Sequence, residues 1–89
     1  MKAVITVIGK DTVGIIAKVS KVLAECNSNI LDISQTTMDN LFTMIMYVDN
    51  AEINIPYNEL SDQLTEAGLK MGLEIRMQRE DIFHSMHSI

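Results

Sequence analysis

The sequence lacks several residue types and patterns that mark common classes of protein. It has no tryptophan, one cysteine, one proline, two tyrosines and two phenylalanines. The single cysteine, Cys26, excludes an internal disulfide. We expect it in the core, because it lies on the apolar stripe of the first expected helix, and no activating base adjoins it in sequence. No apolar run approaches the ~18 residues of a membrane-spanning helix, and the N-terminus does not resemble a signal peptide. We therefore expect a cytoplasmic protein with no membrane partner.

Positive charge is also scarce. Seven basic residues face twelve acidic ones, which gives a formal net charge of −5. Nucleic-acid binding depends mainly on Lys and Arg side chains that neutralise phosphates. RNA-binding sheets also need stacked aromatic residues, and the expected sheet offers Phe42 and Tyr47 alone. Nucleic acid is therefore not an expected partner.

What the sequence does contain is enough apolar residues for one small core, in patterns that alternate between strand and helix. The chain has 89 residues, 47% of them hydrophobic, which is enough for a single domain. The patterns predict strands over residues 2–8, 29–38, 41–49 and 73–79 and helices over residues 13–26 and 57–71. This βαββαβ order predicts a ferredoxin-like α+β sandwich, in which two helices cover one face of a four-stranded antiparallel sheet. We place this domain at residues 1–80 and a helical tail at 81–89.

Three boundaries of these elements have sequence signals of their own. Asp11 or Thr12 is the expected N-cap of the first helix, because short polar side chains accept hydrogen bonds from the first turn. Asp39 and Asn40 are the expected turn of a hairpin between the second and third strands. Gly72 is expected to end the second helix.

The third expected strand is apolar on both of its faces. One face carries Phe42, Met44, Met46 and Val48, and the other carries Leu41, Ile45 and Tyr47. The first expected strand is also apolar on both faces. Val4 and Ile8 lie on one face, and Ala3, Ile5 and Val7 lie on the other. Because helices cover only one face of such a sheet, the other would expose an unusual apolar patch. We expect self-association, as a homodimer or homotetramer, unless the chain's own tail covers this face.

The loop between the first strand and the first helix, "GKDTVG" over residues 9–14, invites a functional interpretation. It is too short for a Walker phosphate loop, and it lacks the glycine spacing of a dinucleotide fingerprint. A helix N-terminus that follows a glycine turn favours a small anion such as a carboxylate. The structural alternative is that Gly9 makes a turn, Asp11 caps the helix and Gly14 relieves crowding against the sheet.

The stretch "VIGKDTVGIIAKVSKVLAECNSNILDI" resembles the opening half of an ACT domain, a small regulatory module that senses amino acids. Gly9, Asp11, Gly14 and Ile15 match the family's loop of glycine, any residue, aspartate, two residues, glycine and an aliphatic residue. The turn "NSNI" at residues 27–30 also fits the family. The chain further resembles the small stand-alone members related to modules of glycine-cleavage regulators.

The resemblance implies a binding module that is not an enzyme and needs no cofactor. In ligand-binding members an amino acid lies between two subunits. The residues implied around it are Gly9, Lys10, Asp11, Thr12, Val13, Gly14 and Ile15 of one subunit and Asn29, Ile30 and Leu31 of the other. Backbone amides at positions 13–15 would hold the α-carboxylate, and Asp11 or an Asn side chain the α-amino group. A regulated protein is a further implied partner.

Two other functions stay open at this point. The first is a protein–protein interaction adaptor that binds no small molecule. The second is a small hydrolase or transferase, although the sequence offers no convincing pair of nucleophile and base.

The tail adds a weak metal candidate. If it is helical, Glu80, His84 and His87 share one stripe at metal-ligand spacing. The plainer interpretation is two ordinary histidines on a solvated helix, and we expect no bound metal. The tail's other side is apolar and is expected to make contacts between subunits; it carries Ile82, Phe83, Met86 and Ile89.

Overall fold

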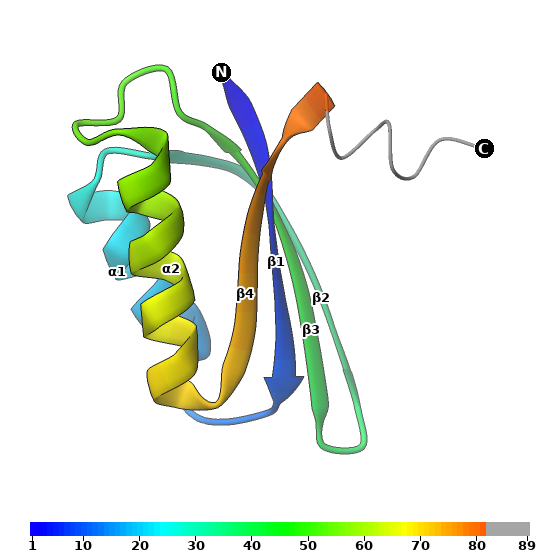
Figure 1. Ribbon diagram of the computed structural model, residues 1–89. Helices are drawn as coiled ribbons and strands as arrows, with labels where there is room; N and C mark the ends of the chain where they lie inside the picture. Colours follow the sequence, from blue (N-terminus) through cyan, green and yellow to red (C-terminus); the bar gives the residue numbers. More distant parts are fainter. Residues whose placement is uncertain (82–89) are drawn as a thin grey trace.

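The computed structural model describes residues 1–81, and these form the expected βαββαβ sandwich (Figure 1). Its elements are β1 (Lys2–Lys10), α1 (Ile15–Glu25), β2 (Asn29–Met38), β3 (Leu41–Asp49), α2 (Tyr57–Met71) and β4 (Leu73–Arg79). The predicted bounds of β2, β3, α2 and β4 are confirmed. β1 runs two residues beyond its predicted end, and α1 is shorter than predicted at both ends. Residues 82–89, and with them His84 and His87, lie outside the described residues.

The four strands form one antiparallel sheet in the order β2-β3-β1-β4. α1 and α2 both lie on the same side of this sheet, and neither covers its other side (Figure 1). We call these the helix face and the open face. The expected hairpin joins Met38 to Leu41 through two residues, and Asp39 takes a positive φ of 54° that Asn and Asp adopt more readily than other side chains. The predicted fold class is therefore confirmed.

The core lies between the helix face and the two helices. Alternate residues of β1 and β3 point into it, and the helices add apolar residues at helical spacing. Its fully buried members are Ala3, Ile5, Val7, Met44, Met46, Val48, Val19, Leu23, Leu60 and Leu64. The helical spacing of Ile16 with Val19 and Leu23 predicts that it is buried as well, and this prediction is wrong, because Ile16 is exposed.

Cys26 lies at the C-terminal end of α1 and belongs to this core, as the sequence indicated. Its thiol lies 3.5 Å from Oε1 of Gln63 on α2. Burial raises the pKa of the thiol above its ordinary value, and the nearby Glu25 and Glu59 carboxylates raise it further. A high pKa disfavours the reactive thiolate, so Cys26 is a packing residue.

The turn that follows α1 is held by polar side chains. Asn27 takes a positive φ of 62° and donates a hydrogen bond to the Glu52 carbonyl at 2.8 Å. The buried Ser28 hydroxyl donates to Oδ1 of Asn50 at 2.5 Å, and the Asn50 backbone N–H donates to the Met1 carbonyl at 2.7 Å. These bonds tie the start of β2 to the end of β3, which gives the Asn-Ser-Asn turn a structural role.

The open face carries exposed apolar side chains near the β2–β3 hairpin, as the sequence predicted. They are Ile8 of β1, Leu41 and Ile45 of β3 and Met38 of β2. The face differs from expectation at its other end. Val4 is only 6% exposed there, between Tyr47 and Gln78 in the strand register, and the Tyr47 hydroxyl donates to Oε1 of Glu80 at 2.5 Å.

A candidate ligand site at the β1–α1 loop

The loop between β1 and α1 is shaped by two close backbone contacts. A Cβ atom on Gly9 would lie 2.6 Å from Cδ2 of Leu73 and 3.1 Å from the carbonyl oxygen of Gly72. Gly9 therefore lets β1 approach the turn between α2 and β4. Two residues later, the Asp11 N–H donates to the Asn40 carbonyl at 2.7 Å, which ties the loop to the hairpin turn.

The predicted N-cap of α1 is wrong. Neither Asp11 nor Thr12 caps the helix; its N-cap is Gly14, with φ 90° and ψ 8°, and no side chain makes a capping hydrogen bond. This left-handed backbone conformation is one that glycine adopts without strain. The first intrahelical bond runs from the Lys18 N–H to the Gly14 carbonyl at 2.9 Å. The N–H groups of Ile15, Ile16 and Ala17 thus have no acceptor within the helix.

These N–H groups lie beside a pocket of about 290 Å³. Its wall on one side is the loop and the first turn of α1, and its wall on the other is the strand pair β2–β3. The lining residues are Asp11, Thr12, Gly14, Ile15, Ile16, Ala17, Gln35, Thr37 and Phe42. The pocket forms because α1 covers only part of the helix face of β2, whose residues are almost all exposed.

The structure brings together four of the residues that the resemblance implied. Asp11, Thr12, Gly14 and Ile15 line the pocket. Gly9 and Lys10 belong to β1 and do not line it, and the side chain of Val13 is 98% exposed at the tip of the loop. The expected residues 29–31 lie at the far end of β2, because β1 and β2 both run antiparallel to β3. One chain alone does not bring them to the loop.

Sequence reasoning missed the second wall, Gln35, Thr37 and Phe42. The register pairs Thr37 with Phe42 and Gln35 with Met44, so Gln35 and Thr37 share the helix face with core residues. On β2 that face changes from Ile30 and Ile33 to these two polar residues. Such a change from apolar to polar along one face was a signal that this end of β2 is not covered by a helix.

The electrostatics of the pocket favour a ligand that carries both charges. The N-terminus of α1 presents N–H donors and the positive end of the helix dipole, which favour a carboxylate. Asp11 also lines the pocket and carries a carboxylate, and carboxylates accept hydrogen bonds from ammonium groups. Gln35 and Thr37 add neutral donors and acceptors. The arrangement suits a small zwitterion better than a simple anion.

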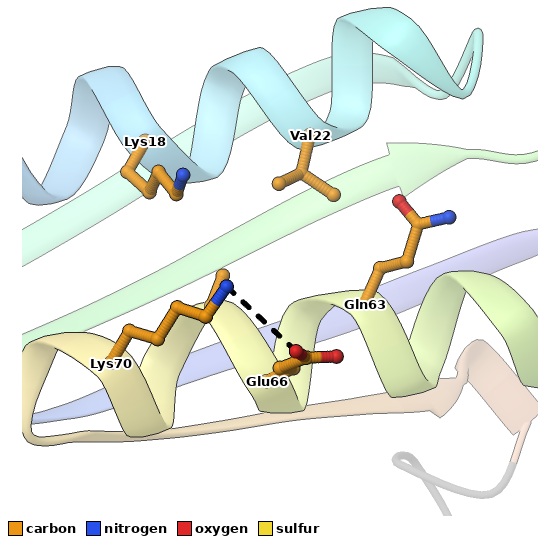
Figure 2. Close-up of a pocket in the computed structure, with 6 residues that line it drawn as sticks. Lys18, Val22, Gln63, Glu66 and Lys70 are labelled. Carbon is orange, nitrogen blue, oxygen red and sulfur yellow. Dashed lines mark ion pairs between the residues drawn. The ribbon is translucent and has the colours of Figure 1, made fainter.

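A second hollow lies between the two helices, and Figure 2 shows its lining. This groove of about 200 Å³ is bounded by Lys18 and Val22 of α1 and by Gln63, Glu66 and Lys70 of α2. The Lys70 ammonium lies 3.8 Å from Glu66, one helical turn away, and both side chains are about 70% exposed to solvent. Solvated charges over an apolar floor are typical of a helix–helix seam, so the loop pocket is the stronger candidate.

The metal candidate gains no support from the part that the structure describes. Glu80 accepts the hydrogen bond from Tyr47, and this bond raises the pKa of the Tyr47 hydroxyl above its ordinary value. Its two expected partners, His84 and His87, lie outside the described residues. Within residues 1–81, no three His, Cys, Asp or Glu side chains are grouped as metal ligands would be.

Neither helix of residues 1–81 is long and apolar enough to cross a membrane.

Comparison with known proteins identifies the class and then the family. The fold defines a small α+β sandwich with an open pocket beside the N-terminus of α1. The model of the ACT domain family matches residues 2–78, and the chain belongs to this family. ACT domains are regulatory modules that bind small ligands.

Relatives and solved structures agree with this assignment. A UPF0237 protein of Methanocaldococcus jannaschii is 52% identical over 88 residues, covering 99% of this chain and 98% of the relative. An ACT domain protein from Streptococcus pneumoniae is 41% identical, with a TM-score of 0.80 and coverage of 93% of both chains. The regulatory subunit of aspartate kinase from Thermus thermophilus, in a ligand-free form, is 26% identical, with a TM-score of 0.67, over 86% of this chain and 50% of that one.

Proposed function

We propose that this protein is a regulatory module that binds a free amino acid, or a similar small zwitterion, in the pocket of the β1–α1 loop. The observation that carries the proposal is the uncapped N-terminus of α1, which opens into a pocket with Asp11 on its rim. The ligand's carboxylate would accept hydrogen bonds from the first-turn N–H groups. Its ammonium group would donate to Asp11 or Gln35. This function involves no catalytic step, and we place the protein in the cytoplasm.

A second copy of the chain would complete the pocket. β2 is an edge strand of ten residues with no proline or lysine, and unpaired edges of this kind tend to pair with another strand. Ile33 and Ile16 are exposed apolar residues on the pocket's side of this edge, and Val13 is exposed on the adjoining loop. Pairing along β2 would remove them from water.

Antiparallel pairing of two β2 strands would bring residues 29–31 of one chain to the loop pocket of the other, which a single chain does not do. A two-fold axis through the sheet near Ile33 pairs β2 antiparallel with its own copy. Residues 29–31 of the partner subunit then lie opposite residues 35–37, two of which, Gln35 and Thr37, belong to the second wall of the pocket. The ligand would contact both subunits, so its binding would favour the paired state over the separate chains.

Thermal unfolding with each of the twenty amino acids, at fixed protein concentration, tests the proposal. A ligand at 100 times its dissociation constant adds ~2.7 kcal/mol per site to the folded state. Each kcal/mol raises the midpoint of a domain of this size by roughly 4–8 °C. We expect a large shift with one or a few amino acids and none with their deaminated analogues.

Two neighbouring threonines of β2 give a matched control. Thr37 lines the pocket, whereas Thr36 faces the open side of the sheet. Thr37→Val removes one hydrogen-bonding group and should weaken ligand binding several-fold, while Thr36→Val should not. Equal effects of the two variants would argue against this pocket.

The second candidate function, a protein–protein adaptor, is favoured by the exposed apolar residues of the open face. The same experiment separates it from the first. If no amino acid raises the midpoint, the adaptor becomes the better account, and the search turns to a protein partner.

A further inference from the structure

The open face of the sheet is a second surface that one chain leaves unpartnered within residues 1–81. Ile8, Leu41, Ile45 and Met38 lie on adjacent strands toward the hairpin, and each is more than two-fifths exposed. Uncharged hydroxyl residues fill the positions between them, among them Thr6 and Thr43. A contiguous apolar patch of this kind on a small soluble domain usually marks a contact surface.

The charges on this face favour a second copy of the same chain as its occupant. The chain has a net charge of −5, so two copies repel each other over most of their surfaces. The strand register, however, places three basic and three acidic residues on the open face. They are Lys2, Lys10, Arg76, Asp32, Asp49 and Glu74. The four strands therefore carry no net charge on this face, and Glu80, which accepts the hydrogen bond from the open-face residue Tyr47, adds one negative charge. Most of the chain's excess negative charge thus lies elsewhere.

The shape of the face is also complementary to itself. A hollow of about 280 Å³ lies over β1 and β4 and is lined by Thr6, Ile8, Glu74 and Arg76. A two-fold axis parallel to the strands stacks β3 of one copy over β1 of the other, and β2 over β4. Ile45, which pairs with Thr6 in the register, then lies above this hollow in the facing copy. The same rotation also stacks Asp32 on β2 of one copy over β4 of the other. Asp32 then lies next to Arg76 on the facing sheet.

We propose that the open face is a self-association surface, on which two copies stack sheet against sheet about a two-fold axis. Four strands spaced ~4.8 Å apart, with a rise of ~3.4 Å per residue, give a face of about 500–600 Å². Two such faces bury at most about 1,000–1,200 Å², at the lower limit for a specific interface. This surface is separate from the edge of β2 and from the loop pocket, so both contacts can form in one four-chain assembly.

Sedimentation velocity over a range of concentrations tests this surface in the full chain. Ile45→Lys buries an unpaired charge at the centre of the stack and should raise its dissociation constant by about tenfold or more. Leu69→Lys, at a 73% exposed position on α2, should leave association unchanged. A wild-type chain that stays monomeric, or an Ile45→Lys variant that associates like the wild type, would overturn the proposal.

Ile33→Lys separates this contact from the one along β2. Ile33 and Ile45 are the same residue type with nearly equal exposure, 40% and 42%, on neighbouring strands but on opposite faces. The Ile33→Lys variant should still stack through the open face. The Ile45→Lys variant should still bind an amino acid in each loop pocket. The two proposals therefore fail in different variants.

Methyl NOEs between labelled and unlabelled copies identify what covers the face. We expect contacts between copies among Ile8, Leu41 and Ile45. NOEs from these methyls to residues 82–89 of the same chain, with none between copies, would show that the tail is the occupant and would overturn the proposal.

Discussion

The two helices of this protein have similar middles and very different ends. α2 follows Pro56, carries Glu59 in its first turn and Lys70 in its last, and closes on Gly72 at φ 72°. The Gly72 N–H donates to the Leu69 carbonyl at 3.2 Å, which satisfies one of the last carbonyl groups. Each of these features stabilises a helix end, by its fixed φ, its charge or its freedom to adopt a left-handed backbone.

α1 has almost none of these features. It starts after Gly14 without a side-chain cap, and it has no acidic residue in its first turn and no basic residue in its last. Its N-terminal N–H groups face the loop pocket, where water or a ligand can reach them. The difference indicates that the end of α1 is left open at the position where a carboxylate could bind. A bound carboxylate would supply the negative charge that Glu59 supplies in α2.

The largest effect we expect comes from the middles of the helices, where the two should behave alike. Leu23 of α1 and Leu64 of α2 are both fully buried. Leu23→Ala and Leu64→Ala should each lower the free energy of unfolding by about 2–5 kcal/mol, because each leaves a cavity. Urea denaturation at fixed protein concentration measures both. A much smaller loss for Leu23→Ala would mean that α1 is loosely held along its whole length and not only at its end.

An intermediate effect is expected at the two glycines that border the helices. Gly14 and Gly72 both have positive φ, and an added Cβ would meet no other atom within 4 Å at either position. Gly14→Ala and Gly72→Ala should therefore each destabilise the protein by about 1–2 kcal/mol, through backbone strain alone.

Ligand binding should separate these two glycine variants. Gly14 lines the pocket and Gly72 does not, so only Gly14→Ala should reduce the thermal shift given by an amino acid. The reduction should exceed what its lower stability explains. If Gly72→Ala reduces ligand binding as much, the uncapped helix end is not the site.

Much of the fold could be predicted because its signals are local. The β-branched run of β1, the two-residue turn at Asp39 and the glycine that ends α2 each depend on neighbours a few residues away. The start of α1 could not be predicted in this way. Asp11 has the side chain of an N-cap, but its backbone N–H is bound to the carbonyl of Asn40, 29 residues further along. That contact exists only once β1 and β3 have paired.

The candidate site likewise has one part that a local sequence motif identifies and one part that only the folded domain brings together. Asp11, Thr12, Gly14 and Ile15 are contiguous, so a short motif could identify them. Gln35 and Thr37 come to the pocket through the register of β2 with β3 and through the incomplete cover that α1 gives to β2. Both facts depend on the packing of the whole domain.

The smallest change in stability is expected when an acidic residue is added to the first turn of α1 and removed from the first turn of α2. Ala17 is the third residue of α1 and Glu59 the third residue of α2, and both are exposed. Ala17→Glu should stabilise the unliganded protein by about 0.3–1 kcal/mol, and Glu59→Gln should destabilise it by a similar amount, because the charge interacts with the helix dipole. Urea denaturation measures both changes in the free energy of unfolding, and both should become smaller in high salt.

Ala17→Glu should also block amino-acid binding, because its carboxylate occupies the positive end of α1, whereas Glu59→Gln should leave binding intact. A stabilised Ala17→Glu variant that still binds the ligand would show that the carboxylate is held elsewhere in the pocket.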